Sequence, residues 1–124
     1  MKDSQSLDVR LLLGAYAQGY FPMPEPKTEA IEWYFPDPRA VIPLNQFHCS
    51  KSLLKKIKQG IFSYTTDQNF TGVMEGCASR KETWINREFI RAYTELPRLG
   101  FAHSIEVWRG KKLVGGVYGV AIGG

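Results

Sequence analysis

At the start of the chain, apolar and polar residues alternate with the spacing of an amphipathic helix. One face of the predicted helix carries Val9, Leu12, Leu13 and Tyr16. Asp8 can cap its N-terminus, and Leu7 can pack against Leu12 as a hydrophobic staple. Gly19 suits the left-handed position that often follows a helix. The pattern therefore predicts a helix that begins after Asp8 and ends before Gly19.

Three more segments show helical spacing. Ser50–Gly60 is a basic amphipathic segment, and we expect its apolar face to point inward; that face carries Leu53, Leu54 and Ile57. In Asp67–Gly76, Asp67 is the expected N-cap. In Asn86–Gly100, Asn86 is the expected N-cap, and a proline and a glycine bring the helix to a close. The buried face of this last helix carries Phe89, Ile90, Tyr93 and Leu96.

Extended segments alternate with these helices. Ile31–Tyr34 is a short apolar run that predicts an extended stretch, and Ala40–Pro43 predicts a strand. A β-branched and aromatic run predicts another strand at Ile61–Thr66. His103–Arg109 and Lys112–Ile122 flank a two-residue turn and predict an antiparallel hairpin. The second of these strands reaches almost to the last residue, with nothing after it to cover its edge. We therefore expect the chain to be truncated.

A proline-rich segment divides the chain. Each proline of Pro36–Pro38 forces the residue before it into an extended conformation, so no helix can cross this segment. We place a domain boundary here, with residues 1–37 as a small N-terminal domain and residues 38–124 as a second, incomplete domain. The alternating elements predict an α/β (α+β) fold with a mainly antiparallel sheet.

Composition narrows the class of protein. Apolar residues make up 44% and charged residues 23% of the chain, as in an ordinary globular protein. No apolar run approaches the roughly 18 residues of a membrane span, and the N-terminus lacks the apolar core of a signal peptide. We expect a soluble, cytoplasmic protein with no membrane partner.

Positive charge is concentrated in one segment. The net charge is +4, and one acid-free stretch holds four lysines, which are Lys51, Lys55, Lys56 and Lys58. Three of them recur at helical spacing on one face. A local excess of cations favours a polyanion such as RNA, although a solvated lysine face gives the same pattern.

The sequence contains no familiar catalytic motif. The two cysteines and two histidines have no metal-ligand spacing, so we expect free thiols and no bound metal. His103, Ser104 and Glu106 lie close together on one predicted strand, but alternation puts His103 on the opposite face from the other two. Structural roles account for all three, and Glu106 is the best candidate for a base.

Two features favour either packing or ligand binding. Trp84 lies between a charged loop and a helix cap, where it can stack on a nucleobase or pack as a hinge residue. The last strand, Val114–Gly124, contains five glycines, which indicate either a bend in a twisted sheet or the close approach of another backbone or a substrate.

Six segments together resemble one family, the leucyl/phenylalanyl-tRNA–protein transferases. They cover most of the chain and occur in the family's order and spacing; they are Gly19–Met23, Trp33–Val41, Glu75–Ala78, Thr83–Ile85, Ala102–Trp108 and Leu113–Val120.

The resemblance implies a small N-terminal domain followed by the first half of a domain with the fold of GCN5-related N-acetyltransferases. It implies an enzyme that moves Leu or Phe from tRNA to the N-terminal Arg or Lys of an acceptor protein, which creates an N-end degradation signal. No cofactor is needed, because the aminoacyl ester is already activated. We expect a monomer.

The resemblance also assigns roles to particular residues. Trp84 matches the tryptophan that stacks on the adenosine, and Met23 stands where some members have a second stacking tryptophan. Val117 matches a position that lines the donor pocket. Lys51, Lys55 and Lys58 match the helix that faces the tRNA acceptor stem. The family's proposed catalytic residues have no counterpart here, so we assign no catalytic residue and expect residues 1–124 alone to be inactive.

Two other functions fit the same features. A CoA-dependent N-acetyltransferase shares the implied fold, and fold alone does not fix function. A non-catalytic RNA-binding module needs only the lysines and Trp84, and it would bind tRNA whether or not the tRNA is aminoacylated.

Overall fold

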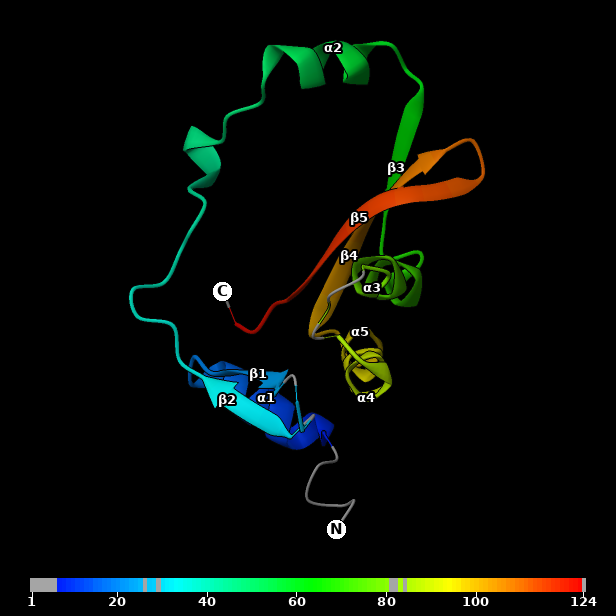
Figure 1. Cartoon of the computed structure of the whole chain (residues 1–124). Coiled ribbons are helices and arrows are strands. Elements are labelled where there is room, and N and C mark those ends of the chain that lie inside the picture. Colours follow the sequence, from blue (N-terminus) through cyan, green and yellow to red (C-terminus); the bar gives the residue numbers. More distant parts are fainter. Residues whose placement is uncertain (1–6, 26, 29, 81–82, 84, 124) are drawn as a thin grey trace.

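The computed structural model describes residues 7–25, 27–28, 30–80, 83 and 85–123, which form helices and two antiparallel sheets (Figure 1). Along the chain the elements are α1 (Val9–Ala17), β1 (Phe21–Pro24), β2 (Ile31–Tyr34), η2 (Leu44–Gln46, a 3-10 helix), α2 (Lys51–Lys58), β3 (Phe62–Thr66), α3 (Phe70–Ala78), α4 (Arg87–Tyr93), α5 (Glu95–Arg98), β4 (Ala102–Arg109) and β5 (Lys112–Val120). The expected mixed α/β fold with an antiparallel sheet is confirmed.

The N-terminal unit consists of α1 and the β1–β2 hairpin. Asp8 caps α1 by accepting a hydrogen bond from the Arg10 amide, and Gly19 follows the helix with φ +92°. The predicted helix is therefore confirmed, and the predicted extended stretch at Ile31–Tyr34 is the strand β2. Strand β1 was not predicted, because Pro22 and Pro24 lack amide hydrogens; a strand with only one neighbour tolerates them.

The segment from Pro36 to α2 arches away from the rest of the molecule (Figure 1). The strand predicted at Ala40–Pro43 is wrong, because these residues pair with no described strand and their side chains are exposed. Helix α2 lies at the top of the arch, and Ser50, the first residue of the predicted helical segment, caps it by accepting a hydrogen bond from the Leu53 amide. The prediction that its apolar face points inward is also wrong, since the side chains of that face are exposed: Leu53, Leu54 and Ile57. The spacing correctly predicts an amphipathic helix, but the described residues provide no surface to cover it.

The larger sheet has the strand order β3-β4-β5, and helix α3 packs on one of its faces. Helix α3 is capped by Asn69, whose side-chain oxygen accepts a hydrogen bond from the Gly72 amide at 2.9 Å. The prediction of Asp67 as the cap is wrong, because Asp67 adopts a left-handed conformation with φ +57° before the helix begins. Its carboxylate accepts a hydrogen bond from the Ser104 amide instead.

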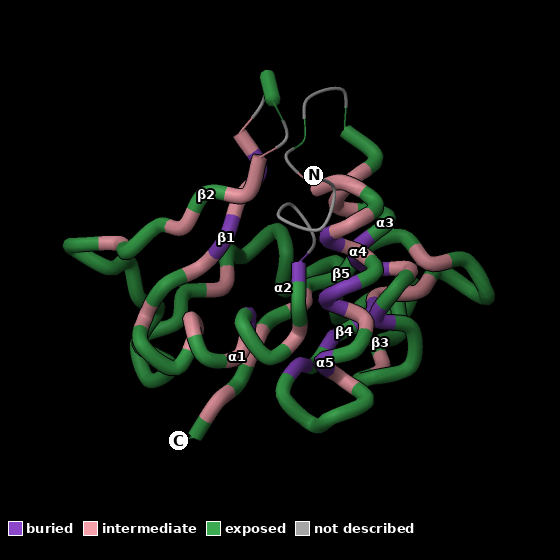
Figure 2. Tube along the Cα trace, turned by 90° about the horizontal axis from the view of Figure 1, so that it is seen from below, coloured by how far each residue is buried: buried purple, intermediate pink, exposed green. Residues whose placement is uncertain are grey.

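The core joins the N-terminal unit to α3, α4, α5 and β4. It contains Leu7, Leu12, Phe70, Met74, Phe89, Ala92, Tyr93, Leu96 and Ala102, and buried residues concentrate there in Figure 2. The Leu7 amide donates to Glu88, and the hydroxyls of Tyr16 and Tyr93 lie 2.6 Å apart. Pro97 would clash with the turn before it in an unbroken helix, so the single helix predicted after Asn86 divides into α4 and α5.

Candidate functional site

The lysines of α2 form an exposed row of cations. Lys51, Lys55 and Lys58 are solvent-exposed, and none of them forms an ion pair with any carboxylate that the structure describes. Lys55 and Lys58 lie in the last turn, near the negative end of the helix dipole, which stabilises them without a nearby acid, whereas Lys51 lies in the first turn. The row is therefore available to an anion in solvent.

Strand β5 presents two different faces. Tyr118 points toward α3 and α4, where its ring centroid lies 5.5 Å from that of Phe70 and 6.4 Å from that of Tyr93. Burial raises the pKa of the Tyr118 hydroxyl to about 12. Val117 points the other way and is 67% exposed. Val117 thus occupies the open face of the sheet.

The surroundings of two glycines of β5, Gly116 and Gly119, differ. A Cβ atom at Gly116 would lie 2.7 Å from Cγ2 of Val73 and 2.9 Å from the Ile105 carbonyl oxygen, so this glycine lets α3 approach the sheet. At Gly119, no atom of the residues that the structure describes lies within 4 Å of the corresponding position. The close approach expected from the glycine-rich pattern is therefore that of a helix at Gly116, while Gly119 leaves the strand uncovered.

Glu106 lies fully buried at the contact between the sheet and α3. Its carboxylate accepts hydrogen bonds from the hydroxyls of Thr65 and Ser104 and from the amides of Gln68 and Asn69. Burial alone would raise the pKa of Glu106, but these hydrogen bonds outweigh it and the pKa is lowered. A buried carboxylate whose oxygens are already occupied is a poor proton acceptor, so the structure favours a structural role over the role of a base.

His103 lies on the opposite face of β4 from Ser104 and Glu106, as alternation predicted. Its Nδ1 atom is 2.9 Å from Oδ2 of Asp67. The pKa of Asp67 is lowered, first by this hydrogen bond from His103 and then by the one from the Ser104 amide. Because both side chains are about half exposed, this pair is a surface contact that fixes the loop before α3.

An open pocket of about 400 Å³ lies in the N-terminal unit. It is lined by Arg10, Leu11, Gly14, Ala15, Gln18, Tyr20 and Trp33. Its lining combines the aromatic residues Tyr20 and Trp33 with one cationic residue, Arg10. The sequence did not predict this pocket, since it depends on the packing of α1 against a hairpin that contains the unpredicted strand β1.

Met23 lies on β1 opposite Glu32 and is half-buried. Cross-strand partners share a face, so Met23 lies on the opposite face of the hairpin from Trp33, which is paired with Pro22. Trp84 lies outside the described residues. The predicted binding groups that the structure does describe thus lie on three elements, β1, α2 and β5, and no hydrogen bond or ion pair among described residues joins them.

Two long-range contacts link the segments Gly19–Met23 and Trp33–Val41. The Arg39 guanidinium donates to the Gly19 carbonyl oxygen at 2.8 Å, and the rings of Tyr20 and Phe35 lie 5.1 Å apart. These contacts anchor the base of the arch to the N-terminal unit. Local patterning gives no signal for them, because the partners are far apart in sequence, by 20 residues for Arg39 and Gly19.

The described residues contain no cluster of three or more histidine, cysteine or acidic side chains able to hold a metal ion. Cys49 and Cys77 are free and half-buried. Among the described residues, no helix has both the length and the apolar character needed to cross a membrane.

Comparison with known proteins gives a consistent result. The profile of the family described as Leucyl/phenylalanyl-tRNA protein transferase matches residues 41–124, and the profile of that family's N-terminal domain matches residues 5–37. A leucyl/phenylalanyl-tRNA–protein transferase of Ruegeria sp. strain TM1040 is 48% identical over 120 residues, which cover 96% of this chain and 57% of the relative. One from Salinibacter ruber is 46% identical over 114 residues, or 92% of this chain and 50% of the relative. The chain therefore spans about half the length of these curated relatives.

Proposed function

Because the chain belongs to the leucyl/phenylalanyl-tRNA protein transferase family, we propose that it binds the acceptor end of an aminoacyl-tRNA. The transferred residue is Leu or Phe, and the acceptor is a cytoplasmic protein with an N-terminal Arg or Lys. The observation that carries this proposal is the exposed row of lysines on α2, which has no described acidic partner. An RNA acceptor stem offers a row of phosphates of complementary charge.

In this proposal each group of residues contacts a different part of the aminoacylated tRNA end. Lys51, Lys55 and Lys58 contact stem phosphates as point charges. Trp84 and Met23 cover the terminal adenosine, and the donor side chain lies at Val117 on the open face of β5. In this proposal residues 38–124 are the first part of an acetyltransferase-like domain, and residues 1–37 are the small domain before it.

The reaction depends more on positioning the two substrates than on activating the aminoacyl ester. The α-amine of the acceptor attacks the aminoacyl ester carbonyl, a proton leaves the amine, and the tRNA hydroxyl departs. Orientation and stabilisation of the developing oxyanion supply the rate enhancement, with no cofactor. Glu106 is unsuitable for removing the proton, since its oxygens are occupied and buried. We therefore expect residues 1–124 alone to bind tRNA without transferring the amino acid.

The test is the affinity for leucyl-tRNA over a series of salt concentrations. Replacing Lys51, Lys55 and Lys58 with alanine should weaken binding and reduce the slope of log affinity against log salt by about one per lysine. The matched control removes three exposed cations at the β4–β5 turn, with Arg109→Ala, Lys111→Ala and Lys112→Ala, and should leave the slope unchanged. Equal losses in the two variants would refute a specific role for α2.

Aminoacylation distinguishes the proposal from a general RNA-binding module. Leucyl-tRNA should bind more tightly than deacylated tRNA, and Trp84→Ala should weaken leucyl-tRNA binding by about tenfold, the value of one base stack. Equal affinity for both forms of tRNA would favour the RNA-binding module. Competition by coenzyme A would favour an acetyltransferase instead.

A further inference from the structure

Asp67 and His103 form an exposed carboxylate–imidazole pair at one end of the β3-β4-β5 sheet. Nδ1 of His103 lies 2.9 Å from Oδ2 of Asp67, and the Ser104 amide donates to Oδ1 at 3.0 Å. The pKa of Asp67 is lowered, first by the hydrogen bond from His103, so the carboxylate is ionised at neutral pH. The two hydrogen bonds fix its orientation, yet the Asp67 side chain is still 48% exposed. This carboxylate, unlike that of Glu106, is therefore open to a ligand.

His103 lies on the same face of the sheet as Val117, the position proposed for the donor side chain. Cross-strand pairing places His103 beside Gly119, and Ile105, two residues further along β4, is paired with Val117. His103 and Val117 are therefore diagonal neighbours, which lie roughly 7–8 Å apart in an antiparallel sheet. Gly119 has no side chain to fill the space beside His103. The neighbouring side chains of this face are uncharged: Tyr64, Thr66, Ile105 and Val117.

An apolar contact next to a carboxylate matches the chemistry of an aminoacyl group. A leucyl group has its apolar side chain and its α-amine on the same carbon atom, so a site for both needs an apolar residue and an acceptor close together. A protonated amine offers three N–H donors. The Asp67 carboxylate offers a negative charge and free lone pairs. Because a carboxylate can only accept, Nδ1 of His103 carries the hydrogen, and Nε2 of the neutral ring is a second acceptor.

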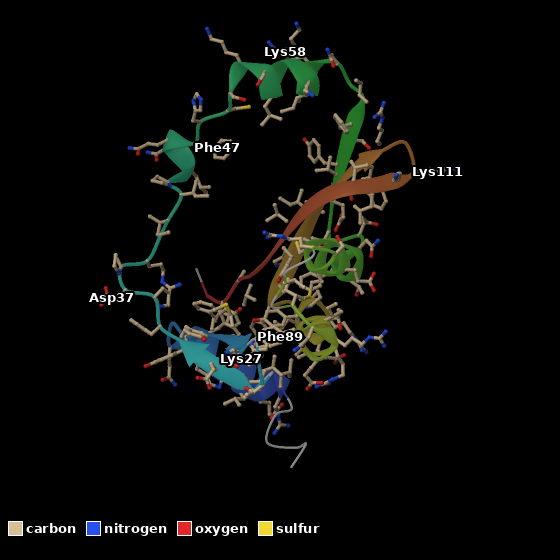
Figure 3. The ribbon with its side chains drawn as sticks, viewed as in Figure 1. Lys27, Asp37, Phe47, Lys58, Phe89 and Lys111 are labelled. Atoms are coloured by element: carbon tan, nitrogen blue, oxygen red, sulfur yellow. The ribbon has the colours of Figure 1, made fainter. Side chains whose placement is uncertain are left out.

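The Asp67–His103 pair also lies at the end of the sheet nearer the N-terminal unit. Figure 3 shows Lys111 at the tip of the β4–β5 turn, and His103 lies at the other end of β4. Ala102, the residue before His103, belongs to the same core as Leu12 of α1. The position proposed for the adenosine, Met23, is in that N-terminal unit. An aminoacyl group attached to the adenosine would therefore approach this end of the sheet rather than the turn.

We propose that Asp67 and His103 bind the protonated α-amine of the donor aminoacyl group while the side chain of that group contacts Val117. This inference rests on the proposed function, since it takes an aminoacyl-tRNA as the ligand, and it adds the chemical group by which a usable donor is recognised. A tRNA that carries a free amino acid gains the ion pair. A tRNA whose amino acid is acylated on nitrogen, as in a peptidyl-tRNA, has no charge to offer and binds more weakly.

The test compares the affinities of leucyl-tRNA and of its α-hydroxy analogue, in which a hydroxyl group of similar size replaces the amine. At pH 7 an α-amine with a pKa of about 7.7–8.0 is mostly protonated, so the two ligands differ chiefly in charge. Leucyl-tRNA should bind the unmodified chain about tenfold more tightly, the value of one hydrogen bond to a charged group.

Two variants show whether Asp67 causes that preference. Asp67→Asn should remove most of it, and asparagine tolerates the left-handed conformation of this position, where φ is +57°. Glu75→Gln is the matched control, because it removes one negative charge from an exposed position of α3, and it should keep the full preference. A general change in tRNA affinity caused by the lost charge cancels in the ratio of the two affinities. Circular dichroism checks that both variants are folded.

Deacylated tRNA separates the failure of this inference from the failure of the proposed function. If leucyl-tRNA and its α-hydroxy analogue bind the unmodified chain equally, and both bind more tightly than deacylated tRNA, the amine site is refuted and the proposed function stands. A preference for leucyl-tRNA that persists in Asp67→Asn refutes the amine site as well. If all three forms of tRNA bind equally, the proposed function and this inference fail together.

Discussion

Replacing Glu106 with glutamine tests whether this buried carboxylate holds the sheet against α3. The carboxylate has two acceptor oxygens for four donors: the Gln68 amide lies 3.3 Å from both oxygens, the Asn69 amide lies 3.1 Å from Oε2, and the hydroxyls of Ser104 and Thr65 also donate. Glutamine keeps one acceptor and turns an NH2 group toward the rest. The Thr65 hydroxyl already accepts a hydrogen bond from Trp108, so it is poorly placed to accept another.

The expected loss follows from the number of broken hydrogen bonds. A hydrogen bond to a charged group contributes about 1.5–3 kcal/mol, and at least one such bond is lost, so Glu106→Gln should lower the free energy of unfolding by about 2 kcal/mol. The assay is urea denaturation at pH 7 followed by circular dichroism. Glu75→Gln, at an exposed position of α3, is the control and should change stability by less than about 0.5 kcal/mol. Equal effects of the two substitutions would refute the role of Glu106.

The pH dependence provides a second check on Glu106. Its pKa is lowered in the folded chain, so its carboxylate stabilises the fold above the pKa of an unfolded glutamate, about 4.3. That stabilisation is lost as the pH falls through the lower folded pKa. The stability difference between the unmodified chain and Glu106→Gln should therefore shrink in acid. A difference that stays constant from pH 7 to the acid limit of folding would contradict a lowered pKa.

Two further predictions follow from close contacts in the second half of the chain. Gly116→Ala should lower the free energy of unfolding by about 1–3 kcal/mol, because the new methyl group meets Val73 and the Ile105 carbonyl, whereas Gly119→Ala meets no atom within 4 Å and should not destabilise the fold; thermal denaturation of both variants checks this. His103→Ala should raise the pKa of Asp67 toward its ordinary value, because it removes the largest cause of the lowering, and an NMR titration in which the pKa of Asp67 does not move would contradict this.

Local sequence patterns predicted most elements but not their surroundings. Capping residues and the helical spacing of apolar residues correctly predicted α1, α2 and α4. Asp8, Ser50 and Asn86 each accept a hydrogen bond from a backbone amide of the turn that follows them. The strand β1 was missed, since its prolines argue against a strand in any local analysis. Asp67 was mistaken for a cap because its position relative to the helix depends on a left-handed turn and a contact with β4.

Burial was predicted less well, because it depends on which other segments pack against a helix or strand and not on the spacing of its apolar residues. The spacing of Leu53, Leu54 and Ile57 marks an apolar face correctly, but whether that face is buried depends on what packs against it. Of the candidate site, the sequence predicted the exposed lysine row and the separation of His103 from Ser104 and Glu106. It could not predict the donors around Glu106, which come from three different elements.

The most direct test of tRNA binding by α2 is a backbone footprint of leucyl-tRNA in the presence of this chain. If α2 contacts the acceptor stem, the unmodified chain should protect acceptor-stem nucleotides from cleavage, and the Lys51, Lys55 and Lys58 alanine variant should lose that protection. Protection confined to other parts of the tRNA, or acceptor-stem protection that persists in the variant, would contradict the account.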